Sequence, residues 1–224
     1  MGVNVGTSAA NTNIGGRECA REGLIVWLDA ANPNSNRDGS DDWYDLSQNA
    51  NDATGVNIET GDGENNGYWD LDGSNEYFNI SNSLGTLTSF TLEVWAKRDD
   101  TSGPEYYIDS RNGASSYFWF LSEYSSYDYN FHNRSRFNDS NSYTTWHQVV
   151  VTENSGGSAI YLNGVQKDTG TTSSGIGANM RIGARYTAAS PWNGQMAIVR
   201  VYNRDISESE ILYNWHTNRG RFGI

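Results

Sequence analysis

The chain has 224 residues, of which 36% are hydrophobic and 13% aromatic, so it can bury a sizeable core and does not have the composition of a disordered protein. The formal net charge is −12, and no cluster of lysine or arginine interrupts the acidic residues. This charge excludes nucleic acid and anionic membrane surfaces as expected partners, and no apolar run reaches the roughly 18 residues of a membrane span.

The first segment, residues 1–22, has almost no apolar periodicity and is rich in glycine, asparagine, serine and threonine. We therefore expect a flexible N-terminal arm over residues 1–22 and a folded domain over residues 23–224. The arm begins with neither the basic residues nor the apolar run of a secretory signal peptide. The single cysteine, Cys19, excludes an intrachain disulfide, so synthesis in a reducing cytoplasm is expected. Arg17 and Arg21 beside this cysteine predict a lowered thiol pKa.

Eleven runs with strand character follow the arm, separated by polar turns. They cover residues 23–29, 68–72, 76–80, 90–97, 105–109, 117–123, 127–132, 146–153, 158–166, 178–183 and 194–203. Within the run 90–96 every second residue is apolar, which predicts that one face of this strand is core. The pair Asn163-Gly164 lies between two apolar runs and tolerates positive φ, so it is the strongest hairpin signal. The pattern predicts an all-β domain.

One helix is predicted, over residues 207–215. Ser207 and Glu210 have the spacing of a capping box, in which each side chain accepts a hydrogen bond from the other residue's backbone N–H. Ile206 and Ile211 have the spacing of a hydrophobic staple across the start of the helix. We expect this short C-terminal helix to cap a β-sandwich.

Eight short strings, taken in their order and spacing over residues 23–215, resemble the laminin-G-like jelly roll of the concanavalin A-like lectin/glucanase superfamily. They are GLIVWLDA (23–30), WYDLS (43–47), LDGSNEYF (71–78), FTLEVWAK (90–97), WHQVVVT (146–152), IYLNG (160–164), MRIG (180–183) and GQMAIVRVYNR (194–204). The resemblance implies an antiparallel jelly-roll β-sandwich of two curved sheets. It does not select a function, because this superfamily includes lectins, glycoside hydrolases, adhesion modules and virion proteins.

The C-terminal string YNWHTNRGRFGI, residues 213–224, resembles the ends of structural proteins from tailed phages, including marine ones. This resemblance implies a non-enzymatic structural or decoration protein that displays the jelly roll on a virion. Such a protein is made in the host cytoplasm, and its arm would dock on other virion proteins. The alternative is a carbohydrate-binding adhesion module that attaches to cell-surface glycans, and a homo-oligomer is compatible with both.

Catalysis is not expected, because no strand carries the alternating acidic residues with which hydrolases of this superfamily cleave sugars. The nearest pair is Asp70 and Asp72, which precede a Gly-Ser-Asn turn and fit a structural role in that turn. The chain's three histidines are scattered without the spacing of a zinc site.

Calcium is the expected cofactor if there is one, because oxygen-rich loops suit a hard cation and the resemblance implies a site at the sandwich rim. The candidate ligands are Asp70, Asp72, Asn75 and Glu76, with the acidic loop 38–42 as a second group. Family members often carry acidic residues where this chain has Ala197 and Ile198. Solvated acidic loops without a bound ion therefore stay the alternative.

Sugar binding needs an aromatic platform flanked by amide and carboxylate groups, and the richest aromatic stretch runs from residue 117 to residue 131. The candidate sugar-binding residues of this stretch are Tyr117, Trp119, Tyr124, Tyr127 and Asn130. Because alternate residues of a strand face opposite ways, one face must be core. The alternative is that most of these rings form the core or a subunit interface.

Overall fold

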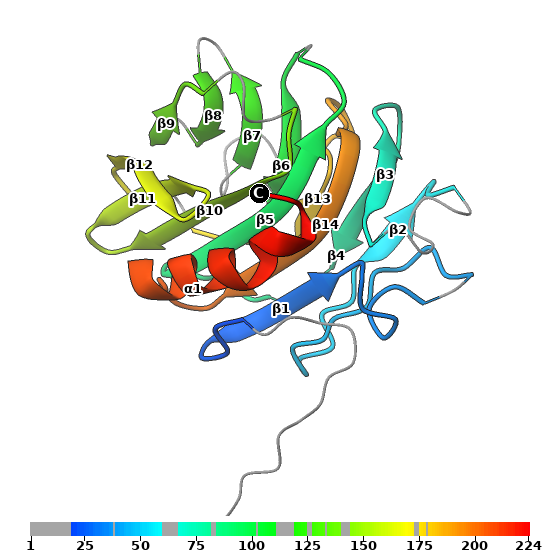
Figure 1. Cartoon of the computed structure of the whole chain (residues 1–224), viewed down its shortest axis with the longest axis horizontal. Coiled ribbons are helices and arrows are strands. Elements are labelled where there is room, and N and C mark those ends of the chain that lie inside the picture. The colour runs from blue at the N-terminus through cyan, green and yellow to red at the C-terminus, as the bar shows by residue number, and fades with distance from the viewer. Residues whose placement is uncertain are drawn as a thin grey trace, which may run out of the picture.

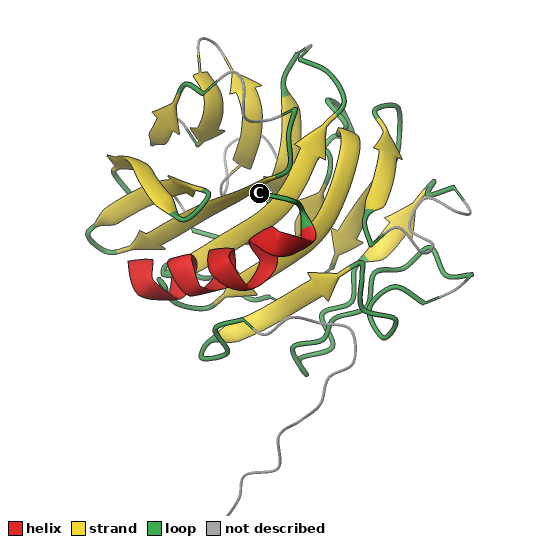
Figure 2. Ribbon diagram, in the orientation of Figure 1, coloured by secondary structure: helices red, strands yellow, loops and turns green. Residues whose placement is uncertain are grey.

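The computed structural model describes residues 19–224 except 38, 60–66, 82–83, 102, 111–118, 125–126, 133, 140–143, 173–174 and 178, and describes only the backbone of residues 119, 121–124 and 127. Two antiparallel sheets pack face to face as a jelly-roll sandwich, and one short C-terminal helix lies across the sheet that faces the viewer (Figures 1 and 2). We call this sheet the front sheet and the other the back sheet. The predicted all-β fold class is confirmed.

The front sheet has the strand order β1-β14-β5-β10-β11-β12, with β3 also paired to β14. Its strands are β1 (Leu24–Asp29), β3 (Trp69–Asp72), β5 (Phe90–Arg98), β10 (His147–Asn154), β11 (Gly157–Leu162), β12 (Val165–Gly170) and β14 (Asn193–Tyr202). The back sheet has the order β2-β4-β13-β6-β7-β8-β9. Its strands are β2 (Thr54–Val56), β4 (Tyr77–Ile80), β6 (Glu105–Asp109), β7 (Trp119–Tyr124), β8 (Tyr127–Phe131), β9 (Ser135–Phe137) and β13 (Met180–Ile182).

Each of the eleven predicted runs contains a strand, but the predicted strand 158–166 is two strands. The chain reverses at Asn163 and Gly164, whose φ angles are 52° and 77°, so the hairpin signal at this pair is confirmed. Two strands were not predicted, Thr54–Val56 and Ser135–Phe137. Each has three residues, too few to show an alternation.

The core lies between the sheets, and β5 shows how alternation builds it. Phe90, Leu92 and Val94 are fully buried in the core between the two sheets. Glu93 and Trp95 lie on the opposite face and are also fully buried. Both faces of this strand are therefore covered, because the helix lies on the outer face of the front sheet (Figure 1).

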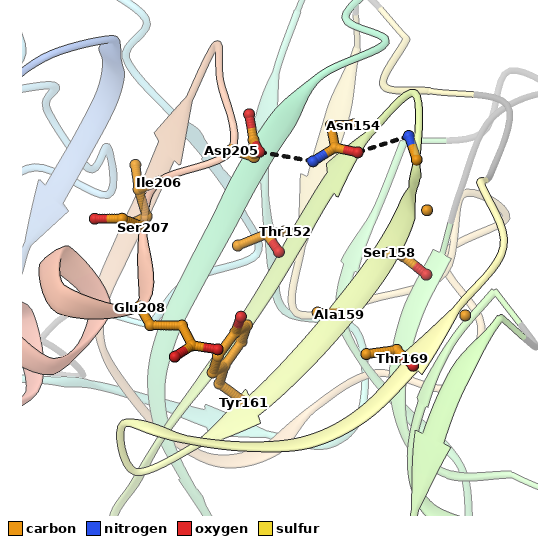
Figure 3. A pocket seen from close by; sticks show the side chains of 13 residues that line it. Thr152, Asn154, Ser158, Ala159, Tyr161, Thr169, Asp205, Ile206, Ser207 and Glu208 are labelled. Atoms are coloured by element: carbon orange, nitrogen blue, oxygen red, sulfur yellow. Dashed lines mark hydrogen bonds between the residues drawn. The ribbon is translucent and has the colours of Figure 1, made fainter.

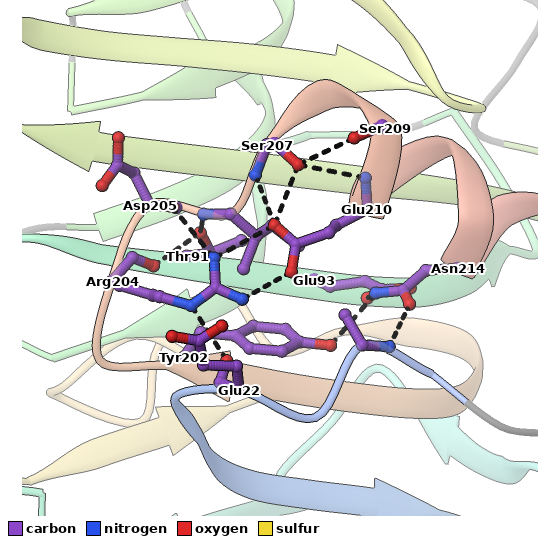
Figure 4. A network of polar contacts seen from close by, with 12 residues as sticks. Glu22, Thr91, Glu93, Tyr202, Arg204, Asp205, Ser207, Ser209, Glu210 and Asn214 are labelled. Atoms are coloured by element: carbon purple, nitrogen blue, oxygen red, sulfur yellow. Dashed lines mark hydrogen bonds and ion pairs between the residues drawn. The ribbon is translucent and has the colours of Figure 1, made fainter.

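The helix α1 (Glu208–Asn218) begins as its sequence predicts. Ser207 accepts a hydrogen bond from the backbone N–H of Glu210, and Glu210 accepts one from the backbone N–H of Ser207, so the capping box is confirmed. Ile206 and Ile211 are both buried in one cluster. Arg204 donates to the Glu210 carboxylate at 3.0 Å (Figure 4). This hydrogen bond is the main cause that lowers the pKa of Glu210 to about 2. A short 3-10 helix, η1 (Arg219–Arg221), follows α1.

The first described residues belong to the packed domain. Cys19 is only 4% exposed and packs in a cluster with Trp27 and Tyr202. The backbone N–H of Ala20 donates to Asn214 of α1 at 2.8 Å. Burial raises the pKa of the Cys19 thiol, so the predicted lowering is wrong. The packed part of the chain thus begins no later than Cys19, and the predicted arm outside it, residues 1–18, lies outside the described residues.

The two sheets also meet along one side of the sandwich, where edge strands β9 and β12 approach each other. The backbone N–H of Arg136 donates to the Asp168 carboxylate at 2.8 Å, and the hydroxyls of Ser135 and Ser158 are 2.7 Å apart. These contacts satisfy polar groups that an open edge would leave free. Among the described residues, no helix combines the length and the apolar character that crossing a bilayer requires.

Candidate functional site

An open groove of about 560 Å³ lies on the outer face of the front sheet (Figure 3). One wall is the β10–β11–β12 hairpin pair, and the other is the loop from β14 into the first turn of α1. The groove therefore lies between two segments about forty residues apart in the chain. The helix start and the hairpins are held together by the packing of α1 on the sheet.

The hairpin wall presents one aromatic ring among hydroxyl groups. Tyr161 of β11, Thr152 of β10 and Thr169 of β12 all line the groove. They share the outer face of the sheet because side chains alternate along each strand. The Tyr161 hydroxyl donates to Gln166 at 3.1 Å, which fixes the ring beside the edge strand β12. Tyr161 is only 6% exposed and belongs to the buried cluster that contains Trp27 and Tyr202, so little of its ring reaches the groove.

The opposite wall is acidic. Asp205 accepts a hydrogen bond from the Asn154 amide at 2.7 Å, which ties the two walls of the groove together (Figure 3). Glu208 lies in the first turn of α1, beside Tyr161 in the same view. Burial is the main cause that raises the pKa of Tyr161, and the Glu208 charge adds to it. Both acidic side chains line the groove and are exposed to solvent.

The groove offers mainly hydrogen-bond acceptors, together with part of the Tyr161 side chain. Carboxylates, an amide and hydroxyls line it, and none of its lining residues is lysine, arginine or histidine. A phosphate or another anion would find no positive partner here. An uncharged molecule with many hydroxyl groups would find acceptors here, beside the small exposed part of the Tyr161 side chain.

The predicted calcium ligands do not share one free set of oxygens. The Glu76 carboxylate is buried and accepts from the backbone N–H groups of Asp72 and Glu59, at 2.7 and 3.3 Å. Asp70 accepts from the Gln195 amide at 2.8 Å. Asn75 is exposed in the turn between β3 and β4. In the described part of the chain, no group of three His, Cys, Asp or Glu side chains is placed to hold a metal ion.

The predicted sugar-binding residues are only partly placed. Tyr117 lies outside the described residues, and Trp119, Tyr124 and Tyr127 have a described backbone only, which pairs Tyr124 with Tyr127 across β7 and β8. Asn130 is fully buried. A glycan cannot reach a side chain with no exposed surface, so Asn130 is not a sugar-binding residue in this structure.

The alternative that aromatic rings of the stretch 117–131 form the core is confirmed for the rings that the structure describes. Phe120, Tyr129 and Phe131 are all fully buried. Phe120 packs on Tyr107 with ring centroids 4.9 Å apart. These three rings of the aromatic stretch therefore stabilise the sandwich.

The sequence did not predict the groove residues, because no local pattern marks them. Tyr161 lies in a strand next to a hairpin turn, where an aromatic residue is ordinary. Asp205 lies in a short connection between β14 and α1. Only the packing of α1 against the front sheet brings these two residues to one groove.

Comparison with known proteins agrees with this fold. The family model described as the concanavalin A-like lectin/glucanases superfamily, of laminin-G type, matches residues 72–212. No curated protein sequence matches the chain. Among solved structures, domain 4 of the GH43 extracellular arabinanase AbnA from Geobacillus stearothermophilus, in complex with arabinotriose, has a TM-score of 0.66 at 14% identity. The match covers 87% of this chain and 99% of that domain.

Two further solved structures are similar over most of this chain but are longer than it. The binding domain of botulinum neurotoxin DC, in complex with SialylT, has a TM-score of 0.59 at 15% identity, and the match covers 88% of this chain and 52% of that one. Trypanosoma rangeli sialidase, in complex with sialic acid, has a TM-score of 0.62 at 15% identity. That match covers 89% of this chain and 33% of the sialidase chain. At these identities the likeness concerns the fold alone.

Proposed function

Because the chain belongs to the concanavalin A-like lectin/glucanase superfamily, we propose that it is a non-catalytic carbohydrate-binding module whose groove beside α1 holds a neutral glycan. The observation that carries this proposal is the lining of the groove. It combines the Tyr161 ring with two carboxylates and the Asn154 amide. The polar groups can bind sugar hydroxyls, and the exposed part of the Tyr161 side chain can contact the apolar part of a sugar.

Charge selects the kind of glycan. Asp205 and Glu208 both line the groove, and the whole chain has a net charge of −12. A sugar that carries a carboxylate would be repelled by these groups, whereas the hydroxyls of a neutral sugar can donate hydrogen bonds to them. Among the similar structures, the arabinanase domain binds arabinotriose, a neutral oligosaccharide, whereas the sialidase binds sialic acid, so the choice rests on the charge of the groove.

The setting of the two groove acids supports the proposal that the chain is non-catalytic. A general acid that cleaves a glycosidic bond must stay protonated near neutral pH, which requires a carboxyl group in a secluded environment. Asp205 and Glu208 are exposed side chains on an open surface. Release of reducing sugar that disappears in Asp205→Asn or Glu208→Gln would contradict a pure binding role.

Replacing Tyr161 by alanine is expected to weaken binding of a neutral glycan about tenfold, or about 1.4 kcal/mol, because the contact to the sugar and the packing that holds this wall of the groove are both lost. The ligand is chosen from an array of neutral and sialylated glycans, and affinities are measured by isothermal titration calorimetry. Tyr213→Ala is the matched control, because Tyr213 is 47% exposed on α1 and does not line the groove. Equal affinities of Tyr161→Ala and the wild type, or a preference for sialylated glycans, would count against the groove.

Display of this module on a tailed-phage virion stays a prediction, supported by the resemblance of residues 213–224. The module and the virion role are compatible, because a displayed sugar-binding domain serves attachment to a host. Mass spectrometry of purified particles tests the location. Deletion of residues 1–16, scored separately for folding and for incorporation into particles, tests whether the arm docks on other virion proteins.

A further inference from the structure

A second aromatic surface lies on the front sheet, on the side of the C-terminal end of α1. It consists of Tyr68, Trp146 and Phe222, and we call it the aromatic shelf. The Trp146 ring is 5.7 Å from the Tyr68 ring and 4.6 Å from the Phe222 ring, measured between centroids. All three side chains are partly exposed. The shelf is therefore a continuous row of rings that solvent reaches.

Buried rings beneath the shelf hold it in place. Phe222 stacks on Trp95 with a centroid distance of 4.8 Å and an interplanar angle of 22°. Trp95 in turn stacks on Trp215 of α1 at 5.3 Å and 12°. Trp95 is fully buried. Because the supporting rings are fixed, a ligand that stacks on the shelf would lose little entropy in ordering it.

A polar rim borders the shelf on the same face of the sheet. The register across β5, β14 and β3 places Lys97 opposite Gln195 and Gln195 opposite Asp70. The Gln195 amide donates to Asp70 at 2.8 Å and to Asp99 at 3.1 Å. Lys97 follows Trp95 by two residues, so both lie on the outer face of β5. The rim thus offers an ammonium group, an amide and carboxylates next to the rings.

We infer that the aromatic shelf and its rim bind a further sugar unit of the neutral glycan held in the groove, an inference that rests on the proposed function. Ring faces beside mixed polar groups match the two sides of a sugar ring. An apolar protein partner would cover Lys97 and Asp70 without satisfying them, which costs free energy, whereas sugar hydroxyls can bind both groups.

The two surfaces lie at opposite ends of α1 on one face of the sandwich. The helix has 11 residues and is therefore about 16 Å long. Gly164 of the β11–β12 turn packs against Leu212 and Trp215 of α1 between the two surfaces. A glycan that touches both must pass over this contact, which requires an oligosaccharide of several units rather than a disaccharide. We therefore expect affinity to rise with glycan length, because one long glycan contacts the groove and the shelf at the same time.

The test uses the indole N–H signals of the full chain in ¹⁵N NMR. The probes are the disaccharides and hexasaccharides of cellulose, xylan and arabinan, and Trp146→Phe identifies the Trp146 signal. At least one hexasaccharide is expected to shift the Trp146 indole together with the backbone amides of Thr152 and Tyr161. The indole of Trp43, which is fully buried, serves as the unshifted control. The same control shows whether each variant is folded.

Trp146→Ala is expected to weaken hexasaccharide binding about tenfold and to leave disaccharide binding in the groove unchanged. Tyr213→Ala should alter neither. If the groove amides shift and the Trp146 indole does not, the shelf is excluded while the groove function stands. If no probe shifts either set, both proposals fail. If the chain sediments as a dimer that Trp146→Ala converts to a monomer, the shelf is an interface between two copies and the inference is overturned.

Discussion

Glu93→Ala is expected to lower the free energy of unfolding by about 3 to 5 kcal/mol, because it leaves a buried arginine without its counter-charge. Glu93 and Arg200 are both fully buried beneath α1. One carboxylate oxygen of Glu93 accepts from Arg200 at 2.8 Å, and the other accepts from Asn214 of the helix at 2.7 Å. The same residue also accepts from Trp95 and Gln148, at 2.8 and 2.9 Å.

Urea unfolding at neutral pH measures this loss, and a double variant separates its causes. In Glu93→Leu with Arg200→Met, no charge is left buried, so most of the lost stability should return. A loss below about 1 kcal/mol for Glu93→Ala would show that water reaches Arg200 in the variant. It would also show that the polar cluster does little to hold α1 on the front sheet.

The free energy of unfolding is expected to fall by up to about 3 kcal/mol as pH rises from about 4.5 to 7, because of Glu105. Burial is the main cause that raises the pKa of this carboxyl from 4.5 to about 7, against the opposing effect of Arg98 at 2.9 Å. The folded protein therefore holds the proton more tightly than the unfolded chain in this range. The stabilisation that Glu105 contributes is fully present below pH 4.5 and is lost as pH rises through 7.

Glu210 has the opposite effect on the free energy of unfolding, and at lower pH: here stability falls as pH falls. Its lowered pKa of about 2 means that its contribution is present above about pH 4.5 and is lost as pH falls through 2. Its side chain is 30% exposed, so solvent limits this contribution to less than about 1 kcal/mol. Unfolding free energies of the wild type and Glu105→Gln, compared at pH 4.5 and 7.5, isolate the larger effect. A pH dependence that is identical in both proteins would contradict the assignment to Glu105.

Local patterns were sufficient for the parts of the fold that local physics determines. The alternation around Phe90 and Leu92 predicted a strand, and the spacing of Ser207 and Glu210 predicted the start of the helix, because both depend only on neighbours in the chain. The burial of Glu93 could not be predicted in this way. The helix that covers it lies more than one hundred residues later in the chain.

The candidate site depends on tertiary structure to a greater degree. Tyr161 and Asp205 meet in one groove only because α1 packs beside the hairpins. The acidic turn was expected to supply calcium ligands, but Glu76 instead accepts from the backbone N–H groups of Asp72, in its own turn, and of Glu59, which follows β2. A carboxylate in a turn can either bind a cation or accept hydrogen bonds from backbone N–H groups, and the sequence does not distinguish these two roles.

A crystal structure of the chain with a bound neutral oligosaccharide tests the central claim most directly. The account predicts a sugar ring in the groove against Tyr161, with hydroxyls within hydrogen-bond distance of Asp205 or Glu208. A glycan bound to the back sheet, with the groove left empty at saturating ligand, would contradict it.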